Sequence, residues 1–448
     1  MNGPSNPPNG NGDARSEPAS GISRRSLFRR GGAAAIALGA GATLAGCENT
    51  TTPVASGAGG GGRGILGDPT AGGPVDSAGI PLARKDYPVT MPRLGDAVSS
   101  SAKPERGGEL RVYNYADYVN PAVIKDFGKR EGVSVRVTTF DTLDEAFSKL
   151  STGGLQFDVI FSTPDQLSRL VGAQIVQPLN YELIPNLQKN VWPELHDPFY
   201  DVGPRYTVPY VTYTTGIAWR NDLLGFDPSK MDQPWDAFWS PQAEQYRGKV
   251  AILDDSREGP GMALMRRGVT DLNTEDPDLL AQAGEDLKDL SKRVGVKVSI
   301  ADYETVPAGR VLLHQGWSGD MIAGVISYMP KGVKPDVLSY WYQKQGGPIF
   351  NDCICVAAKA TKPVIAHRFL NYLLDNKVSY ENFTGYVGYQ TPLTAIDAQK
   401  LFDDEILPKT LSQAVVTREA YANGNAYLTL SAKGLQLWDR TWASFRNG

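Results

Sequence analysis

Three acidic side chains point to the chemistry of this 448-residue chain. Asp255 and Glu258 lie three residues apart, directly after an apolar run that predicts a strand, and Asp352 follows a turn at Gly346-Gly347. Carboxylates are the natural acceptors for alkylammonium donors, and one charge-assisted hydrogen bond contributes about 1.5 to 3 kcal/mol. These acids therefore indicate a binding site for an organic cation.

The same region allows a second interpretation. Asp254, Asp255 and Glu258 supply the carboxylate pair that glycoside hydrolysis requires across a cleft. No other pattern supports an enzyme, because the three histidines are scattered and the chain contains neither Gly-x-Ser-x-Gly nor His-x-x-x-His. We therefore predict no catalytic residue, no metal site and no cofactor.

The first 46 residues have the pattern of an export signal. Arg24-Arg25 forms a twin-arginine motif, and the apolar run at 31–45 is too short and glycine-rich to span a bilayer. The run ends in Leu-Ala-Gly-Cys, which looks like a lipobox, so we expect cleavage before Cys47 and lipidation of its thiol. An ordinary secretory signal with a coincidental cysteine is the alternative. We predict an exported protein held by lipid on the outer face of the cytoplasmic membrane, at the cell surface or in the periplasm.

Residues 47–106 have the composition of a flexible tether. They are rich in Gly, Pro and Ser and have no helical or strand periodicity, so the lipidated Cys47 would hold a globular body at a distance. The proline-containing piece at 80–93 is expected to lie extended along that body. With 45 basic against 49 acidic residues, the chain lacks the positive charge that a nucleic-acid partner requires.

From residue 107 onward, short apolar strands alternate with amphipathic helices, which predicts an α/β fold. A strand is expected at 110–114, a helix at 121–131 with Pro at its first turn, a strand at 133–139, a helix at 142–150 and a strand at 157–161. Residues 162–165 then cap a helix that ends at 171. Later elements of the same kind are predicted at 215–221, 250–253, 276–294, 311–316, 353–357 and 364–374.

Cys353 and Cys355 both belong to the predicted strand at 353–357. Residues two apart on a strand point to one face at about 6.6 Å, the upper limit for a disulfide. We therefore expect buried, reduced thiols there.

Six motifs occur in the order seen in the spermidine/putrescine-binding proteins of ABC transporters: 112–118, 157–163, 208–210, 254–258, 346–352 and 388–392. From about residue 107 to its end, the chain therefore resembles this family. The resemblance implies two α/β lobes with mixed sheets, joined by crossing hinge segments, with a ligand cleft between them. The first lobe would comprise 107–214 and 351–399, and the second 215–350 and 400–448.

The resemblance also implies the residues of the site. The acids are Asp255, Glu258 and Asp352, Ser162 is a polar contact, and the aromatic walls are Tyr115, Tyr118, Trp317, Phe350 and Tyr389. Aromatic faces cover methylene segments and attract cations by about 0.5 to 2 kcal/mol per contact. The family usually has Trp at two of these walls, where this chain has Tyr115 and Phe350, and it often has Tyr where this chain has Pro164. These differences leave the choice of amine open.

We therefore expect a monomeric receptor that captures a polyamine and delivers it to a membrane permease, without chemistry of its own. The alternatives are a receptor for a quaternary amine or ferric ion, a secreted glycoside hydrolase, and a structural surface lipoprotein. Phe350, Asn351 and Asp352 fall at the expected crossover between lobes, so we also expect ligand bound to Asp352 to favour lobe closure.

Overall fold

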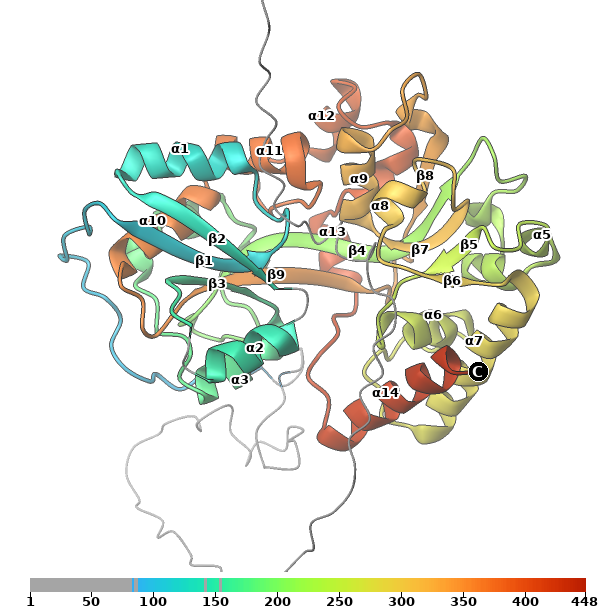
Figure 1. The fold of residues 1–448 in the computed structure, drawn as a ribbon, viewed down its shortest axis with the longest axis horizontal. Helices are drawn as coiled ribbons and strands as arrows, with labels where there is room; N and C mark the ends of the chain where they lie inside the picture. The colour runs from blue at the N-terminus through green and yellow to red at the C-terminus, as the bar shows by residue number, and fades with distance from the viewer. Residues whose placement is uncertain (1–82, 84–87, 141–142, 153–154) are drawn as a thin grey trace, which may run out of the picture. The chain divides into compact units, whose positions relative to one another are not determined.

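The computed structural model describes residues 83, 88–140, 143–152 and 155–448 (Figure 1). The predicted signal peptide, Cys47 and most of the predicted tether lie outside these residues. One 9-stranded sheet runs through the described body in the order β2-β1-β3-β9-β4-β7-β5-β6, with β8 also paired to β4. No helix among the described residues is long and apolar enough to cross a membrane.

The first lobe is built on strands β1 (Glu109–Tyr115), β2 (Ser134–Phe140) and β3 (Val159–Ser162). β1 is parallel to both of its neighbours. Helices cover both faces of these strands: α1 and α11 lie on one side, and α2 and α3 on the other (Figure 1). The helices of this lobe are α1 (Pro121–Glu131), α2 (Leu143–Ser151), α3 (Pro164–Gly172), α4 (Pro185–Asn190), α10 (Pro363–Leu373) and α11 (Asn376–Asn382).

Two long strands connect the lobes. β4 (Val208–Arg220) and β9 (Ile349–Val356) run antiparallel, with Val211 opposite Asp352 and Thr214 opposite Ile349. The first part of β4 pairs with β9, and its second part pairs with β7 (Leu313–Trp317) and β8 (Leu338–Trp341). The strands predicted at 215–221 and 353–357 are therefore real but begin several residues earlier than expected.

The second lobe adds strands β5 (Val250–Ile252) and β6 (Lys297–Val298) to β7 and β8. Its helices are α5 (Pro241–Glu244), α6 (Glu258–Arg266), α7 (Pro277–Val294), α8 (Asp302–Thr305), α9 (Ser318–Ser327) and α14 (Ala432–Arg446). Between the sheet's last strand and the C-terminus also lie the π-helix η8 (Phe383–Val387), α12 (Ala398–Asp403) and α13 (Arg418–Asn423). Helix α13 contacts the first lobe, because Arg418 forms an ion pair with Glu194.

Single-turn and short 3-10 helices complete the described secondary structure. They are η3 (Tyr181–Leu183), η4 (Pro193–Leu195), η5 (Pro228–Lys230), η6 (Pro234–Trp239), η7 (Pro335–Val337) and η9 (Lys409–Ala414).

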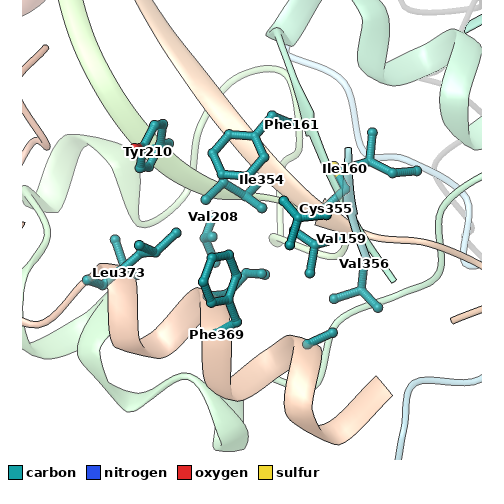
Figure 2. Close-up of a cluster of buried hydrophobic side chains, with 14 of the residues drawn as sticks. Val159, Ile160, Phe161, Val208, Tyr210, Ile354, Cys355, Val356, Phe369 and Leu373 are labelled. Atoms are coloured by element: carbon teal, nitrogen blue, oxygen red, sulfur yellow. The ribbon is translucent and has the colours of Figure 1, made fainter. Parts of the chain in front are cut away.

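Each lobe has its own hydrophobic core. In the first lobe, side chains of β3, β4 and β9 pack on α10, with Phe161, Ile354 and Phe369 at the centre (Figure 2). In the second lobe, Trp235 and Trp438 pack with residues of α6 and α7. Cys353 and Cys355 are buried free thiols, as predicted.

The described end of the predicted tether lies on the first lobe. Val89 exchanges backbone hydrogen bonds with Phe199 and Val202, and Met91 is buried. The expectation that this piece lies extended along the body is confirmed for its described residues. Glu105, farther along, accepts hydrogen bonds from the N–H groups of Val364 and Ile365 and so caps α10.

Candidate functional site

Glu258 is a buried carboxylate at the start of α6. Thr215 Oγ1 (2.8 Å) and Trp317 Nε1 (3.0 Å) donate to its Oε1, and the Tyr427 hydroxyl (3.2 Å) donates to its Oε2. Burial raises the pKa of Glu258 to about 8, and the negative charge of Asp255 adds to this effect. The three donors oppose the rise, since each stabilises the ionised form. The site thus holds a carboxylate that an arriving cation would stabilise in its charged form.

Asp255 has a different role in its surroundings. It is half-buried, and its Oδ1 accepts hydrogen bonds from the N–H groups of Arg257 (2.7 Å) and Glu258 (3.0 Å). It therefore caps the beginning of α6 and acts on Glu258 through its charge. Asp254 points elsewhere, because it is exposed and forms an ion pair with Arg446.

Asp352 lies in β9 and is only 3% exposed. The Tyr118 hydroxyl donates to its Oδ2 (2.7 Å), and the Tyr213 hydroxyl donates to its Oδ1 (3.3 Å). Burial raises the pKa of Tyr118 well above its ordinary value, and the neighbouring Asp352 charge raises it further, so Tyr118 acts as a proton donor to the carboxylate. Because β9 connects the lobes, this carboxylate is held at their junction.

A third carboxylate, Asp320, meets the first lobe from the first turn of α9. The Tyr389 hydroxyl donates to its Oδ1 (2.9 Å), and Asp320 is 6% exposed. The Tyr389 ring packs so closely on Gly319 that a Cβ there would lie 2.5 Å from it. A glycine at 319 is therefore required for this contact between the lobes.

The aromatic side chains form one continuous series of rings between these acids. Neighbouring centroids are 5.0 to 5.4 Å apart along the series Tyr115, Tyr118, Tyr389, Tyr213, Phe350 and Tyr427. Four of the five predicted walls belong to this series. The fifth, Trp317, is joined to it through Glu258, which also accepts from Tyr427. The rings pack on one another in a row with carboxylates beside them, a composition that suits an elongated cation.

The profile of the bacterial extracellular solute-binding protein family matches residues 122–409. The chain belongs to this family. Among its relatives are the spermidine/putrescine-binding periplasmic protein 1 of Haemophilus influenzae, 28% identical over 315 residues that cover 69% of this chain and 82% of the relative. The putrescine-binding periplasmic protein PotF of Escherichia coli is 29% identical over 291 residues, which cover 62% and 76% of the two chains.

Solved structures agree with this solute-binding family. The spermidine/putrescine ABC transporter substrate-binding protein PotD of Streptococcus pneumoniae superposes with a TM-score of 0.61 at 22% identity, covering 76% of this chain and 99% of PotD. A putative spermidine/putrescine ABC transporter protein of Listeria monocytogenes gives 0.62 at 24% identity, with 75% and 98% covered. These likenesses confirm the predicted two-lobed fold. The matched family is described as solute-binding proteins, which agrees with the prediction of a binding protein and not an enzyme.

Ser162 is the predicted site residue with the fewest contacts to the others. It is fully buried at the end of β3, and its hydroxyl donates to the Thr163 carbonyl (3.4 Å). In the sheet it lies opposite Cys353, next to Asp352. Within the part of the chain that the structure describes, no group of three or more His, Cys, Asp or Glu is placed to hold a metal ion.

Sequence reasoning missed four residues of this cluster. Tyr213 and Thr215 share one face of β4, which the alternation of a strand would have indicated had the strand been extended back to 208. Asp320 lies three residues after Trp317, at the start of a helix. Tyr427 lies in an irregular segment between α13 and α14, and no sequence pattern marks it.

Proposed function

We propose that this protein is the receptor of an ABC importer and that its solute is a polyamine of the spermidine/putrescine class. The observation that carries the proposal is the row of aromatic rings with three acids beside it, Glu258, Asp320 and Asp352. Each of these acids accepts a hydrogen bond from a tyrosine hydroxyl. An alkylammonium group can replace such a hydroxyl as donor, with a stronger, charge-assisted bond. The named specificities of the relatives agree with this choice of ligand.

Within this proposal the residues divide the ligand between them. Glu258 and Asp352 bind ammonium groups, with Asp255 adding negative charge, and Asp320 provides a further acceptor. The methylene segments lie against the aromatic walls, which are Tyr115, Tyr118, Trp317, Phe350 and Tyr389, with Tyr213 and Tyr427 in the same row. Ser162 contributes a polar group at the end of β3.

Ligand binding is proposed to favour closure of the two lobes. Tyr389 meets Asp320 of the second lobe, and Asp352 lies on a strand shared by both, so a ligand that touches all three binds best when the lobes are closed. The lobe boundaries predicted from the sequence are kept in this proposal. Saturating polyamine should reduce the radius of gyration in solution scattering, and Asp352→Asn should reduce both the change and the affinity. Identical scattering curves at proven saturation would contradict closure.

Export and anchoring complete the proposal. The twin-arginine motif and the Leu-Ala-Gly-Cys sequence support translocation, cleavage before Cys47 and lipidation, which would hold the monomeric receptor near its permease. Cys47→Ala should release folded protein from the membrane fraction with a changed mass. Membrane-bound Cys47→Ala protein of unchanged mass would contradict the anchor and leave ligand binding unaffected.

Calorimetric titration of the exported protein tests the ligand class. Putrescine and spermidine should bind, whereas butane-1,4-diol, which has the chain length of putrescine without its charges, should give no heat of binding. Choline has a charge but no N–H donor, and it should bind more weakly because carboxylates here serve as hydrogen-bond acceptors. Tighter binding of choline than of any primary amine would contradict the polyamine assignment.

A further inference from the structure

A second acidic side chain lies behind Asp320. Asp302, at the start of α8, is fully buried, and its Oδ2 accepts a hydrogen bond from the backbone N–H of Trp317 (3.2 Å). Its Oδ1 accepts no N–H or O–H group in the described part of the chain. The bond from Trp317 places the Asp302 carboxyl group at the N-terminus of α9, because Trp317 directly precedes that helix and Asp320 lies in its first turn. The Asp302 side chain packs so closely on Gly316 that a Cβ there would lie 2.4 Å from Asp302 Oδ2.

Two carboxyl groups at one buried helix end favour holding a proton between them, because like charges in a buried site destabilise each other. Burial and the charge of Asp320 both raise the pKa of Asp302 well above its ordinary value. Asp320 lies in the first turn of α9, where the helix dipole favours a negative charge. The proton therefore belongs to Asp302 and the charge to Asp320.

Tyr389 and Tyr340 are the ionisable groups that interact with the pair, and the acid Glu258 also acts on Tyr340. Tyr389, which follows η8, donates to Asp320. Tyr340 of β8 has its pKa raised by burial and, less strongly, by the charges of Glu258 and Asp302. Tyr340 donates its hydroxyl proton to the Thr214 carbonyl and stays neutral because its pKa is raised. The surroundings thus favour a single negative charge on the pair.

We propose that Asp302 is a positioning residue of the ligand site: it donates its proton to Asp320 and so fixes one carboxylate oxygen toward the ammonium end of the solute. The inference rests on the proposed function. It explains how Asp320, the acid that meets Tyr389 across the lobes, keeps one orientation while it bonds to Tyr389 and to a ligand. It also makes a primary ammonium the preferred group at this end, because a fixed acceptor requires an N–H donor.

Two substitutions of Asp302 distinguish the loss of its hydrogen-bond donor from a change in side-chain volume. Asp302→Asn keeps an N–H donor of similar volume and should leave putrescine affinity within about twofold. Asp302→Leu removes the donor and should lower that affinity about tenfold or more, as expected for a lost hydrogen bond to a charged group. The putrescine affinity of both variants is compared with that of the wild type by calorimetric titration, and circular dichroism checks that the variants are folded. Wild-type affinity in folded Asp302→Leu protein would overturn the proposal.

An infrared measurement tests the proton without any ligand. Glu258 is itself protonated below its raised pKa, so the comparison uses the Glu258→Gln background. Protein with Asp302 should show the C=O band of a protonated carboxyl group, and the added Asp302→Asn change should remove it. Identical spectra would overturn the proposal even if Asp302→Leu does not fold. If wild-type protein binds no amine while the band is present, the proposed function fails and the Asp302 proton stands.

Discussion

The two lobes contribute different chemistry to the cluster at their junction. The first lobe supplies rings and hydroxyl donors, because Tyr115 ends β1, Tyr118 follows that strand and Tyr389 follows η8. The second lobe also supplies rings and donors, such as Trp317 and Tyr427, and it adds acceptors, since Glu258 starts α6 and Asp320 lies in the first turn of α9. Asp352 lies between them on β9. The hydrogen bond from Tyr389 to Asp320 joins one side to the other.

This difference identifies which side a cation would stabilise. Tyrosine rings are satisfied by packing and by their donated hydrogen bonds, so the first lobe gains little from a ligand charge. A buried carboxylate is costly until it is paired, so the second lobe gains most. Substitution of a buried acid such as Glu258 should therefore change ligand affinity more than substitution of the half-buried Asp255. Neutralising a buried acid should also stabilise the protein without ligand.

Glu258→Gln should have the largest effect. Loss of the charged acceptor should weaken polyamine binding by about 10- to 150-fold, the equivalent of a charge-assisted hydrogen bond. The control substitution is Glu285→Gln, because Glu285 is exposed on α7 and forms an ion pair with Lys288. This variant should bind polyamine with unchanged affinity. Equal calorimetric titration curves for Glu258→Gln and wild type would place the cation elsewhere.

The same variant tests the burial of Glu258 through stability. The folded pKa of about 8 exceeds the ordinary 4.5, so the folded state holds a proton that the unfolded chain releases above pH 4.5. Wild-type stability should therefore fall as pH rises from 4.5 to 8, and Glu258→Gln should lose this part of the decline. Denaturant unfolding at pH 5 and pH 8 measures it. An equally steep decline in both proteins would contradict the buried position of Glu258.

Ligand binding should show the opposite pH trend, with a smaller effect over the accessible range. An ammonium group binds the ionised form of Glu258, so wild-type affinity should rise about fivefold from pH 7 to pH 8, the pKa of Glu258, and level off above about pH 9. Titrations in two buffers of different ionisation enthalpy should show proton release on binding. A profile that stays level from pH 6 to pH 8 would mean that Glu258 is already ionised before the ligand arrives.

Trp317→Phe should have a moderate effect. The indole N–H lowers the pKa of Glu258, so its loss should raise that pKa further and reduce affinity at pH 7 by about three- to tenfold, close to one hydrogen bond. Trp239 is a matched control, because its indole donates to the Asp286 carbonyl in the core of the second lobe. Trp239→Phe should reduce stability without moving the pH profile of binding. Equal effects of the two substitutions on affinity would indicate a general packing role for Trp317.

The sequence predicted elements best where local signals are complete. Helix α1 was predicted with its observed bounds, because Asn120 caps it, Pro121 begins it and Gly132 ends it in the left-handed conformation. The starts of β4 and β9 were missed, since Pro209 and the polar pair Asn351-Asp352 do not resemble strand residues. Their place in the sheet comes from pairing with each other, which a single sequence does not contain.

The candidate site follows the same rule. Glu258 could be found because it comes after a predicted strand, where open α/β sheets present side chains to ligands, and Trp317 was implied by the family resemblance. The partners of Glu258 could not, because Thr215 and Tyr427 reach it from positions 43 and 169 residues away. The raised pKa of Glu258 is a property of that tertiary environment, since burial is its main cause. The sequence therefore predicted which acidic residue belongs to the site, but not the buried surroundings that raise the pKa of that residue.

Asp255→Asn should have the smallest effect, although the sequence places Asp255 beside Glu258. Its Oδ1 accepts from two backbone N–H groups at the start of α6, and Asn caps helices about as well as Asp, so the fold should be preserved. Removing its charge has two opposing consequences for a ligand. The attraction for the ammonium group falls, and the pKa of Glu258 also falls, which leaves more of that carboxylate ionised at pH 7. Affinity should therefore change by less than about threefold, as for a partly exposed charge. The midpoint of the pH profile should move downward, which a lost ligand contact alone would not produce. A loss as large as that of Glu258→Gln, with an unmoved midpoint, would instead make Asp255 a direct ligand and would weaken the distinction between buried acids and the acid at the edge.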